Sequence, residues 1–226
     1  MPPLANAAGL LETVTPEADA SKRWLTTRAT VKASLLIGDT TKDALLDLMI
    51  PRVSALIAKE CFLARDNAGG VASFARETLR ATWFPTARAR GPELALPWRV
   101  PVTEIVGVTR DDEALDPEEY RLVSAIPGRL QFLFDGAPAC WSGRKIVAEF
   151  KAGFVLPDDV PADLEAATIE QVKAMLMATD RDPAIRSVNS PDIGAESYSL
   201  PGGDTFKGML LPQVVDAIGA YRDPLP

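Results

Sequence analysis

Residues 146–179, IVAEFKAGFVLPDDVPADLEAATIEQVKAMLMAT, decide the fold because the spacing of their apolar residues changes midway. At the start, Ile146, Ala148 and Phe150 recur at every second position, and a period of two predicts a half-buried strand. After Pro161 the apolar residues recur every three to four positions, which predicts an amphipathic helix. One short segment thus joins a β part to a helical part, and we expect an α+β fold.

The helical part extends in both directions from this segment. Proline suits a first helical turn and acidic residues favour the positive end of the helix dipole, so the helix begins near Pro161 with Asp163 and Glu165. Its apolar face comprises Leu164, Thr168, Val172, Met175, Leu176 and Thr179. A last short helix is expected near Pro212, with Val214, Val215, Ile218 and Tyr221 at helical spacing.

Residues 43–60 hold the clearest amphipathic pattern. The stripe comprises Leu45, Leu46, Met49, Val53, Leu56 and Ile57. Pro51 lies inside it and costs about 3 kcal/mol in a helix interior, so the helix either kinks there or starts anew, and we favour a kink. This stripe can pack against the one in 162–179. A short helix capped by a threonine is expected in 27–37.

Between these helices the period is two. Strands are expected at 102–109, 120–123 and 130–134, and short turns join them, which favours a small antiparallel sheet or barrel. Residues 71–84 satisfy the helical and the extended pattern equally, so both remain open there.

These patterns predict a discontinuous α-helical bundle with an inserted small antiparallel β domain and an extended C-terminal arm. The helical domain would comprise residues 25–90 and 157–226, and the β-rich insertion residues 91–156. Residues 1–24, with three prolines and no sustained period, are expected to form a flexible arm. Residues 181–208, rich in Pro, Gly, Ser and Asp, would form the extended arm, since structureless loops of this length are commonly partner-binding.

The composition excludes several kinds of function. The 226 residues contain no histidine, which removes Ser-His and Cys-His catalysis and the commonest metal ligand. A net charge of −7 opposes binding to the phosphate backbone of DNA. The two cysteines lack a metal-ligand spacing, and no stretch is apolar enough to span a membrane, so we expect a soluble protein in the cytoplasm of the producing cell.

Four local patterns could carry chemistry, but each has a simpler interpretation. Ser142 and Lys145 have SxxK spacing, yet in a strand positions three apart point to opposite faces. The acidic residues of 111–116 depart from calcium-loop spacing, and those of 158–163 suit a turn and helix start, although an acidic pair could face a neighbouring subunit. We therefore expect no catalytic residue, cofactor or metal. The four aromatic residues Trp83, Phe84, Trp98 and Trp141 are expected in the core or at a domain junction.

Several sequence segments, taken in their order along the chain, resemble those of one protein family. Residues 27–60 are similar to the opening helices of head-tail adaptor (connector) proteins of tailed bacteriophages and gene transfer agents. Residues 96–154, ending in IVAEFKAGF, resemble that family's run of strands, and VPADLEAA (160–167) its next helix start. Arg181-Asp182-Pro183 resembles the end of that helix. The finish, 211–222, resembles its closing helix.

The resemblance implies a structural, non-enzymatic subunit. Such proteins form a ring, usually of twelve subunits, in the neck of the virion between the portal protein and the stopper or tail completion protein. DNA passes through the channel during packaging and ejection without specific binding. The family's C-terminal arm contact makes Tyr198, Phe206, Tyr221 and Arg222 the candidates for binding the portal.

Two other functions remain open. Another neck protein, such as a stopper or a tail terminator, would also form a ring, but the two long amphipathic helices favour the adaptor. A small hydrolase using carboxylates lacks a convincing nucleophile or base.

Overall fold

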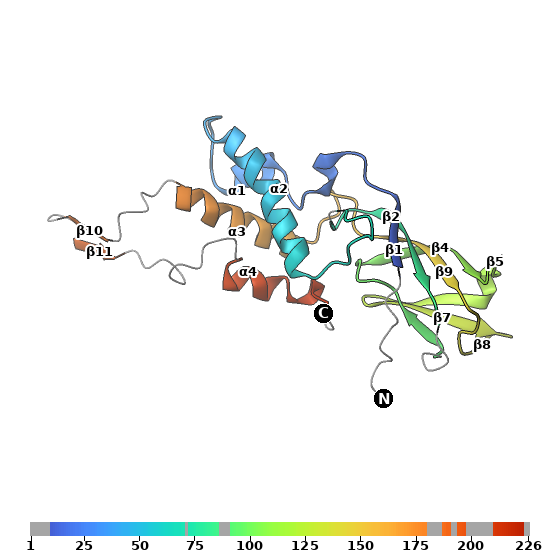
Figure 1. The fold of residues 1–226 in the computed structure, drawn as a ribbon. Coiled ribbons are helices and arrows are strands. Elements are labelled where there is room, and N and C mark those ends of the chain that lie inside the picture. Colours follow the sequence, from blue (N-terminus) through green and yellow to red (C-terminus); the bar gives the residue numbers. More distant parts are fainter. Residues whose placement is uncertain are drawn as a thin grey trace.

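The computed structural model describes residues 10–70, 72–85, 91–179, 187–190, 194–197 and 210–223. The α-helices gather in one part of the molecule and the two larger antiparallel sheets in the other (Figure 1). The α+β class predicted from the change of period is confirmed.

The helices lie where the apolar stripes predict them. The α-helices are α1 (Arg28–Ser34), α2 (Asp43–Glu60), α3 (Ala162–Thr179) and α4 (Pro212–Ala217), and the 3₁₀ helices are η1 (Ala20–Arg23), η2 (Pro117–Glu119) and η3 (Gly219–Tyr221). Thr27 caps α1, because its side chain accepts a hydrogen bond from the Thr30 amide at 3.1 Å. Helix α2 continues through Pro51 without starting anew.

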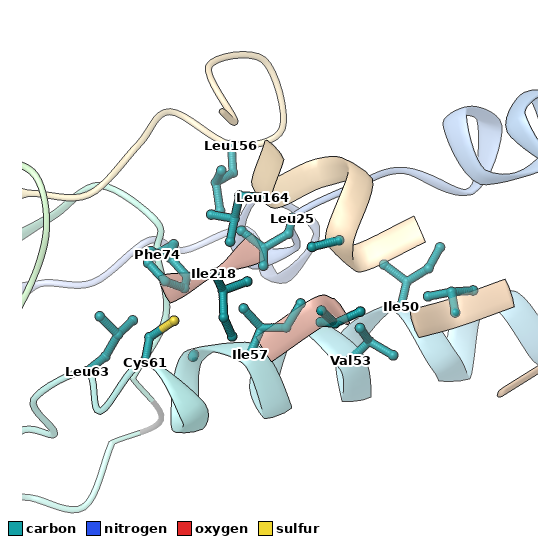
Figure 2. Close-up of a cluster of buried hydrophobic side chains, with 14 of the residues drawn as sticks. Leu25, Ile50, Val53, Ile57, Cys61, Leu63, Phe74, Leu156, Leu164 and Ile218 are labelled. Atoms are coloured by element: carbon teal, nitrogen blue, oxygen red, sulfur yellow. The ribbon is translucent and has the colours of Figure 1, made fainter. Parts of the chain in front are cut away.

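The helical core forms where α2 and α3 pack with α4. Figure 2 shows Val53 and Ile57 of α2, Leu164 of α3 and Ile218, which follows α4, in one cluster, and all four side chains are fully buried. Truncating a buried residue such as Ile57 to alanine removes transfer energy and leaves a cavity, at about 2–5 kcal/mol. The stripes of 43–60 and 162–179 therefore meet.

The strands form two main sheets. The strands are β1 (Leu10–Thr15), β2 (Glu77–Trp83), β3 (Glu93–Ala95), β4 (Val102–Arg110), β5 (Glu113–Ala114), β6 (Tyr120–Ala125), β7 (Gly128–Phe134), β8 (Ala137–Pro138) and β9 (Ile146–Ala152). One sheet has the order β1-β2-β9-β4-β5 and the other the order β3-β7-β6, with β8 paired to β7. The named strand pairs are antiparallel.

The second core lies between these sheets. Ile146, Ala148 and Phe150 of β9 are fully buried, and Leu130 and Phe132 of β7 pack in the same cluster. The alternation predicted for 146–150 is confirmed. The other face of the β1-β2-β9-β4-β5 sheet carries the side chains that alternate with these, among them polar and charged ones.

The β part begins earlier in the chain than the expected boundary at residue 91. Residues 77–83, left open between helix and strand, form β2, an interior strand of the larger sheet between β1 and β9. Residues 10–15, expected in a flexible arm, form its edge strand β1, and Asp19 caps η1. Pairing with β2 satisfies the backbone hydrogen-bonding groups of β1. The sequence does not reveal this pairing, because only one side chain of β1 is buried.

Within the expected arm of 181–208, two short strands are described. Strands β10 (Ser187–Ser190) and β11 (Gly194–Ser197) pair antiparallel. The rest of that range lies outside the described residues.

Candidate functional site

The closing segment of the chain, residues 211–223, packs on the helical core, and its last residues contact the segments that lead into the β part. Tyr221 donates its hydroxyl hydrogen to Asp163 Oδ1 at the start of α3, at 2.8 Å. Its carbonyl oxygen accepts a hydrogen bond from Trp98 Nε1 at 3.0 Å, and its ring meets Phe74 edge to face at 6.2 Å. One residue thus joins α3 to the segments that lead into the β part.

The environment of Tyr221 opposes ionisation. Partial burial, and then the hydrogen bond to the Asp163 carboxylate, raise the pKa of Tyr221 to about 12. The phenol therefore stays protonated and remains a donor at neutral pH.

Arg222 fastens the same segment to the end of α2. Its Nη2 lies 2.7 Å from Glu60 Oε1, its Nε donates to the Glu60 carbonyl at 3.3 Å, and its guanidinium stacks 5.6 Å from the ring centroid of Phe62. The next amide, of Asp223, donates to the carbonyl of Cys61 at 3.1 Å. Burial raises the pKa of the Cys61 thiol to about 12.

The four residues predicted for portal binding divide into two pairs. Tyr221 and Arg222 lie together in the closing segment, partly exposed and partnered within the chain. Tyr198 and Phe206 lie outside the described residues.

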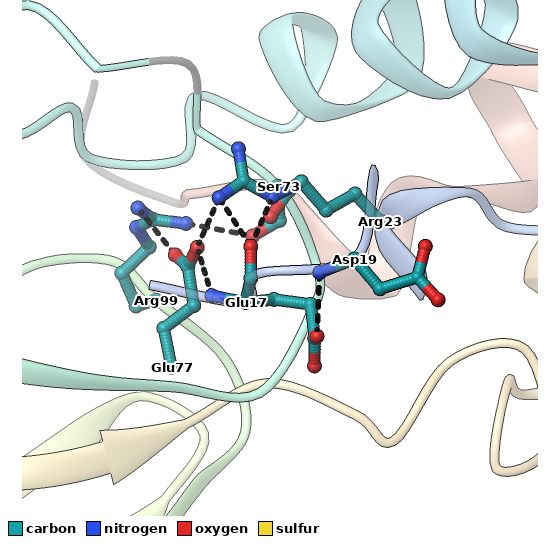
Figure 3. A network of polar contacts seen from close by, with 6 residues as sticks. All are labelled: Glu17, Asp19, Arg23, Ser73, Glu77 and Arg99. Carbon is teal, nitrogen blue, oxygen red and sulfur yellow. Dashed lines mark hydrogen bonds and ion pairs between the residues drawn. The ribbon is translucent and has the colours of Figure 1, made fainter. Parts of the chain in front are cut away.

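A buried ion pair holds the junction from the β side. Glu77 at the start of β2 and Arg99 before β4 are each 4% exposed, and Arg99 Nη2 lies 3.2 Å from Glu77 Oε2 (Figure 3). Arg99 Nη1 also donates to the Ser73 carbonyl at 2.7 Å. Burial lowers the pKa of Arg99 and Glu77 opposes that shift, so the carboxylate offsets part of the cost of burying the guanidinium charge.

The same carboxylate attaches the segment that follows β1. Glu77 Oε1 accepts from the Glu17 amide at 3.4 Å and lies 3.8 Å from Arg23 Nη2 (Figure 3). Arg23 Nη2 also donates to the Glu17 carbonyl at 2.6 Å. Sequence reasoning missed this network, because a glutamate at a core position of a strand interrupts the apolar pattern. The unusual placement of Glu77 in phase with Leu79, Ala81 and Trp83 was the available signal.

Gly153 allows the chain to pass between the two cores. Its φ is +101°, and a Cβ there would overlap the carbonyl oxygen of Ala75, with which the chain forms a parallel bridge through Phe154. Only glycine fits this conformation and this close approach.

The residues considered above as candidates for catalysis or metal binding stabilise turns between strands. Ser142 is exposed beside Gly143, while Lys145 pairs with Asp112 at 2.8 Å, so serine and lysine do not form a catalytic pair. Asp111 Oδ1 accepts hydrogen bonds from the Arg144 and Lys145 amides, which hold the pKa of Asp111 below its usual value. Among the described residues, no acidic or cysteine cluster could hold a metal ion.

Of the four singled-out aromatic residues, three are core residues. Trp83 and Trp141 are buried in the β core and Trp98 in the helical core, whereas Phe84 is exposed. The expectation of packing is confirmed for the tryptophans.

The outward face of the larger sheet bears a hollow of about 650 Å³. Its lining includes Val106 of β4, Val147 and Glu149 of β9, Arg80 of β2, and Tyr120. Arg80 lies 3.2 Å from Glu149 and 3.3 Å from Glu12 of β1, so this cation is compensated within the sheet. The hollow is open and has no buried nucleophile, which suits contact with another surface.

The architecture is that of an α+β protein with a helical and a β core joined by a polar junction. Among the described residues, no helix is long and apolar enough to cross a membrane.

Comparison with solved structures shows which known proteins this fold resembles. The chain is similar to one in a structure described as the neck of an empty gene transfer agent (GTA) particle computed with C6 symmetry, with 19% identity and a TM-score of 0.51 over 94% of both chains. It is also similar to a chain in the virion of a native GTA particle, with 18% identity and a TM-score of 0.55 over 94% of this chain and 95% of that one. TM-scores above 0.5 over nearly the whole of both chains show a shared fold. No protein-family model and no curated protein matches the chain.

Proposed function

We propose that this chain is a structural head-tail adaptor subunit in the neck of a phage or phage-like particle. Copies form a ring, of twelve subunits in this proposal, between the portal protein and the stopper or tail completion protein. The ring surrounds a channel through which double-stranded DNA passes. The subunit has no catalytic function, is made in the bacterial host cytoplasm and becomes part of the virion.

The observation that carries this proposal is the likeness, over nearly the whole length of both chains, to chains of a GTA neck and virion. A match that includes both cores and the order of parts supports the same structural role. The neck was computed with sixfold symmetry, with which a ring of twelve subunits is compatible.

The charge of the protein supports passage of DNA without binding. A net charge of −7 repels the phosphate backbone as a whole, which supports a channel in which DNA slides without adhering. Two 18-residue α-helices, α2 and α3, favour an adaptor over a stopper or tail terminator, which remain the alternatives.

Contact with the portal is assigned to residues 181–208, with Tyr198 and Phe206, and to the closing segment with Tyr221 and Arg222. The bonds of Tyr221 and Arg222 to Asp163 and Glu60 fix the closing segment on the helical core. An arm that leads into this fixed base reaches a partner from a defined position on the subunit.

Deletion of residues 190–208 tests the portal contact. Binding of the purified variant to portal rings is expected to fall at least tenfold, while its thermal unfolding stays within a few degrees of the full chain. Full binding by the deletion variant would remove the arm from the proposal. Electron microscopy of particles carrying tagged chain then identifies the neck layer, and a position other than the layer beneath the portal would contradict the adaptor role.

A further inference from the structure

Helix α2 has a second face, opposite to the core, that carries a stripe of exposed residues. Leu48, Arg52, Ala55 and Lys59 follow one another at steps of four, three and four, so they line one side of the helix. Leu48 is 57% exposed. We call these four residues the α2 stripe.

The cations of the α2 stripe are uncompensated. Within the described part of the chain, neither Arg52 nor Lys59 has an ion-pair partner, whereas the neighbouring Arg28 lies 2.7 Å from Asp47. The stripe therefore offers an apolar side chain and two positive charges about two helical turns, or ~10 Å, apart at their Cα atoms.

The hollow on the sheet has complementary properties. Its lining presents Val106, which is 46% exposed, together with Val147 and the ring of Tyr120. Arg80 and Lys145 in the lining are already paired with carboxylates. Covering compensated charges forfeits less solvation than covering isolated ones, so this lining suits a protein contact.

Uncompensated acids flank the hollow. Glu113 and Glu118 are exposed and adjoin the lining residues Ala114 and Pro117 in the sequence. No described residue pairs with either side-chain carboxylate. A nucleic acid would be repelled at this rim, while a basic helix would be attracted.

We propose that the α2 stripe of one copy docks in the hollow of a second copy, with Leu48 on Val106 and the cations toward the acids Glu113 and Glu118. The two surfaces belong to different parts of the subunit, the helices and the far strands (Figure 1). Such a contact is head-to-tail, and its repetition generates a ring if the rotation closes. The inference rests on the proposed ring and names its subunit interface.

Zero-length carbodiimide crosslinking tests the contact directly, because it joins an amine to a carboxylate only where they touch. An equal mixture of ¹⁴N- and ¹⁵N-labelled wild-type chains, at high concentration, is expected to yield mixed-isotope peptides linking Lys59 to Glu113 or Glu118. Links confined to other sites, or no mixed-isotope link, would overturn the inference.

Charge reversal provides the second test. The variant R52E/K59E and the variant E113R/E118R should each associate at least about tenfold more weakly than the wild type, because like charges then face each other. Their equimolar mixture should recover association, since each reversed surface meets a reversed partner, and recovery also shows that both variants fold.

The control R65E/R76E changes the net charge equally at exposed arginines outside the α2 stripe and should associate like the wild type. Loss of association in this control, or none in the two variants, contradicts the interface.

The two tests separate this inference from the proposed function. Particles that incorporate R52E/K59E in a normal neck would refute the interface and keep the neck role. Wild-type chain that associates as proposed but is absent from particle necks would refute the neck role alone.

Discussion

The closing segment and the α2 stripe both place basic and apolar side chains at the surface, yet their polar groups behave differently. Arg222 is engaged by the side chain and carbonyl of Glu60 and by the ring of Phe62. Arg52 on the α2 stripe has no such partner among the described residues. A surface residue that has an ion-pair partner within the chain stabilises the fold, whereas one without such a partner is available to bind another molecule. This difference does not follow from residue type or exposure.

The largest expected effect lies at the junction, where the buried charges of Glu77 and Arg99 pair with each other. In Glu77→Ala, Arg99 would stay buried without its carboxylate, and the free energy of unfolding should fall by about 3–5 kcal/mol. Urea denaturation measures this change. The matched control, Glu149→Ala, removes the partner of half-exposed Arg80 and should cost less than about 1 kcal/mol. Equal losses in both variants would show that the junction is not more sensitive than the sheet face.

An intermediate effect is expected at Tyr221. In Tyr221→Phe the hydrogen bond to Asp163 is lost, which should reduce the free energy of unfolding by about 1 kcal/mol at neutral pH. The folded pKa of about 12 lies above the usual value near 10, so this stabilisation is complete below pH 10 and declines as the pH rises through 12.

Denaturation at several pH values follows this difference. The two proteins should converge in stability as the pH rises from 10 to 12. A constant gap across that range would contradict the assigned role of the phenol.

The smallest effects compare the two arginines themselves. Arg222→Ala should lower the free energy of unfolding by about 1 kcal/mol, because the half-exposed contacts with Glu60 and Phe62 are lost. Arg52→Ala should stay within about 0.5 kcal/mol of the wild type. Thermal unfolding of both variants at low protein concentration, where self-association is absent, makes the comparison. A larger loss for Arg52→Ala would mean that the α2 stripe serves the subunit fold.

The helices could be predicted because each one carries its own signals. Thr27 caps α1, the apolar residues of α2 from Leu45 to Ile57 recur at helical spacing over more than three turns, and Pro161 precedes α3. Strand β9 was equally clear because its buried residues alternate without a break. In these segments, local preference and burial agree.

The edge strand and the junction escaped prediction for physical reasons. Only Leu11 is buried in β1, since an edge strand contributes little to the core and its partner β2 lies more than sixty positions away. Buried Glu77 and Arg99 contradict the apolar pattern individually and make sense only as a pair across space. The sequence made Tyr221 and Arg222 candidates for portal binding. It could not predict their hydrogen bonds to Asp163 and Glu60, because these depend on the fold.

The junction also bears on how the chain matures at the ribosome. Trp98 bonds to the carbonyl of Tyr221, which is synthesised 123 positions later. Glu60 bonds to Arg222, which is synthesised 162 positions later. Translation adds roughly 5–20 residues per second, so Glu60 and Trp98 emerge several seconds or more before these contacts can form. A nascent subunit would thus expose the rim of its helical core until residues 211–223 have emerged, which delays its competence to assemble until this segment is in place.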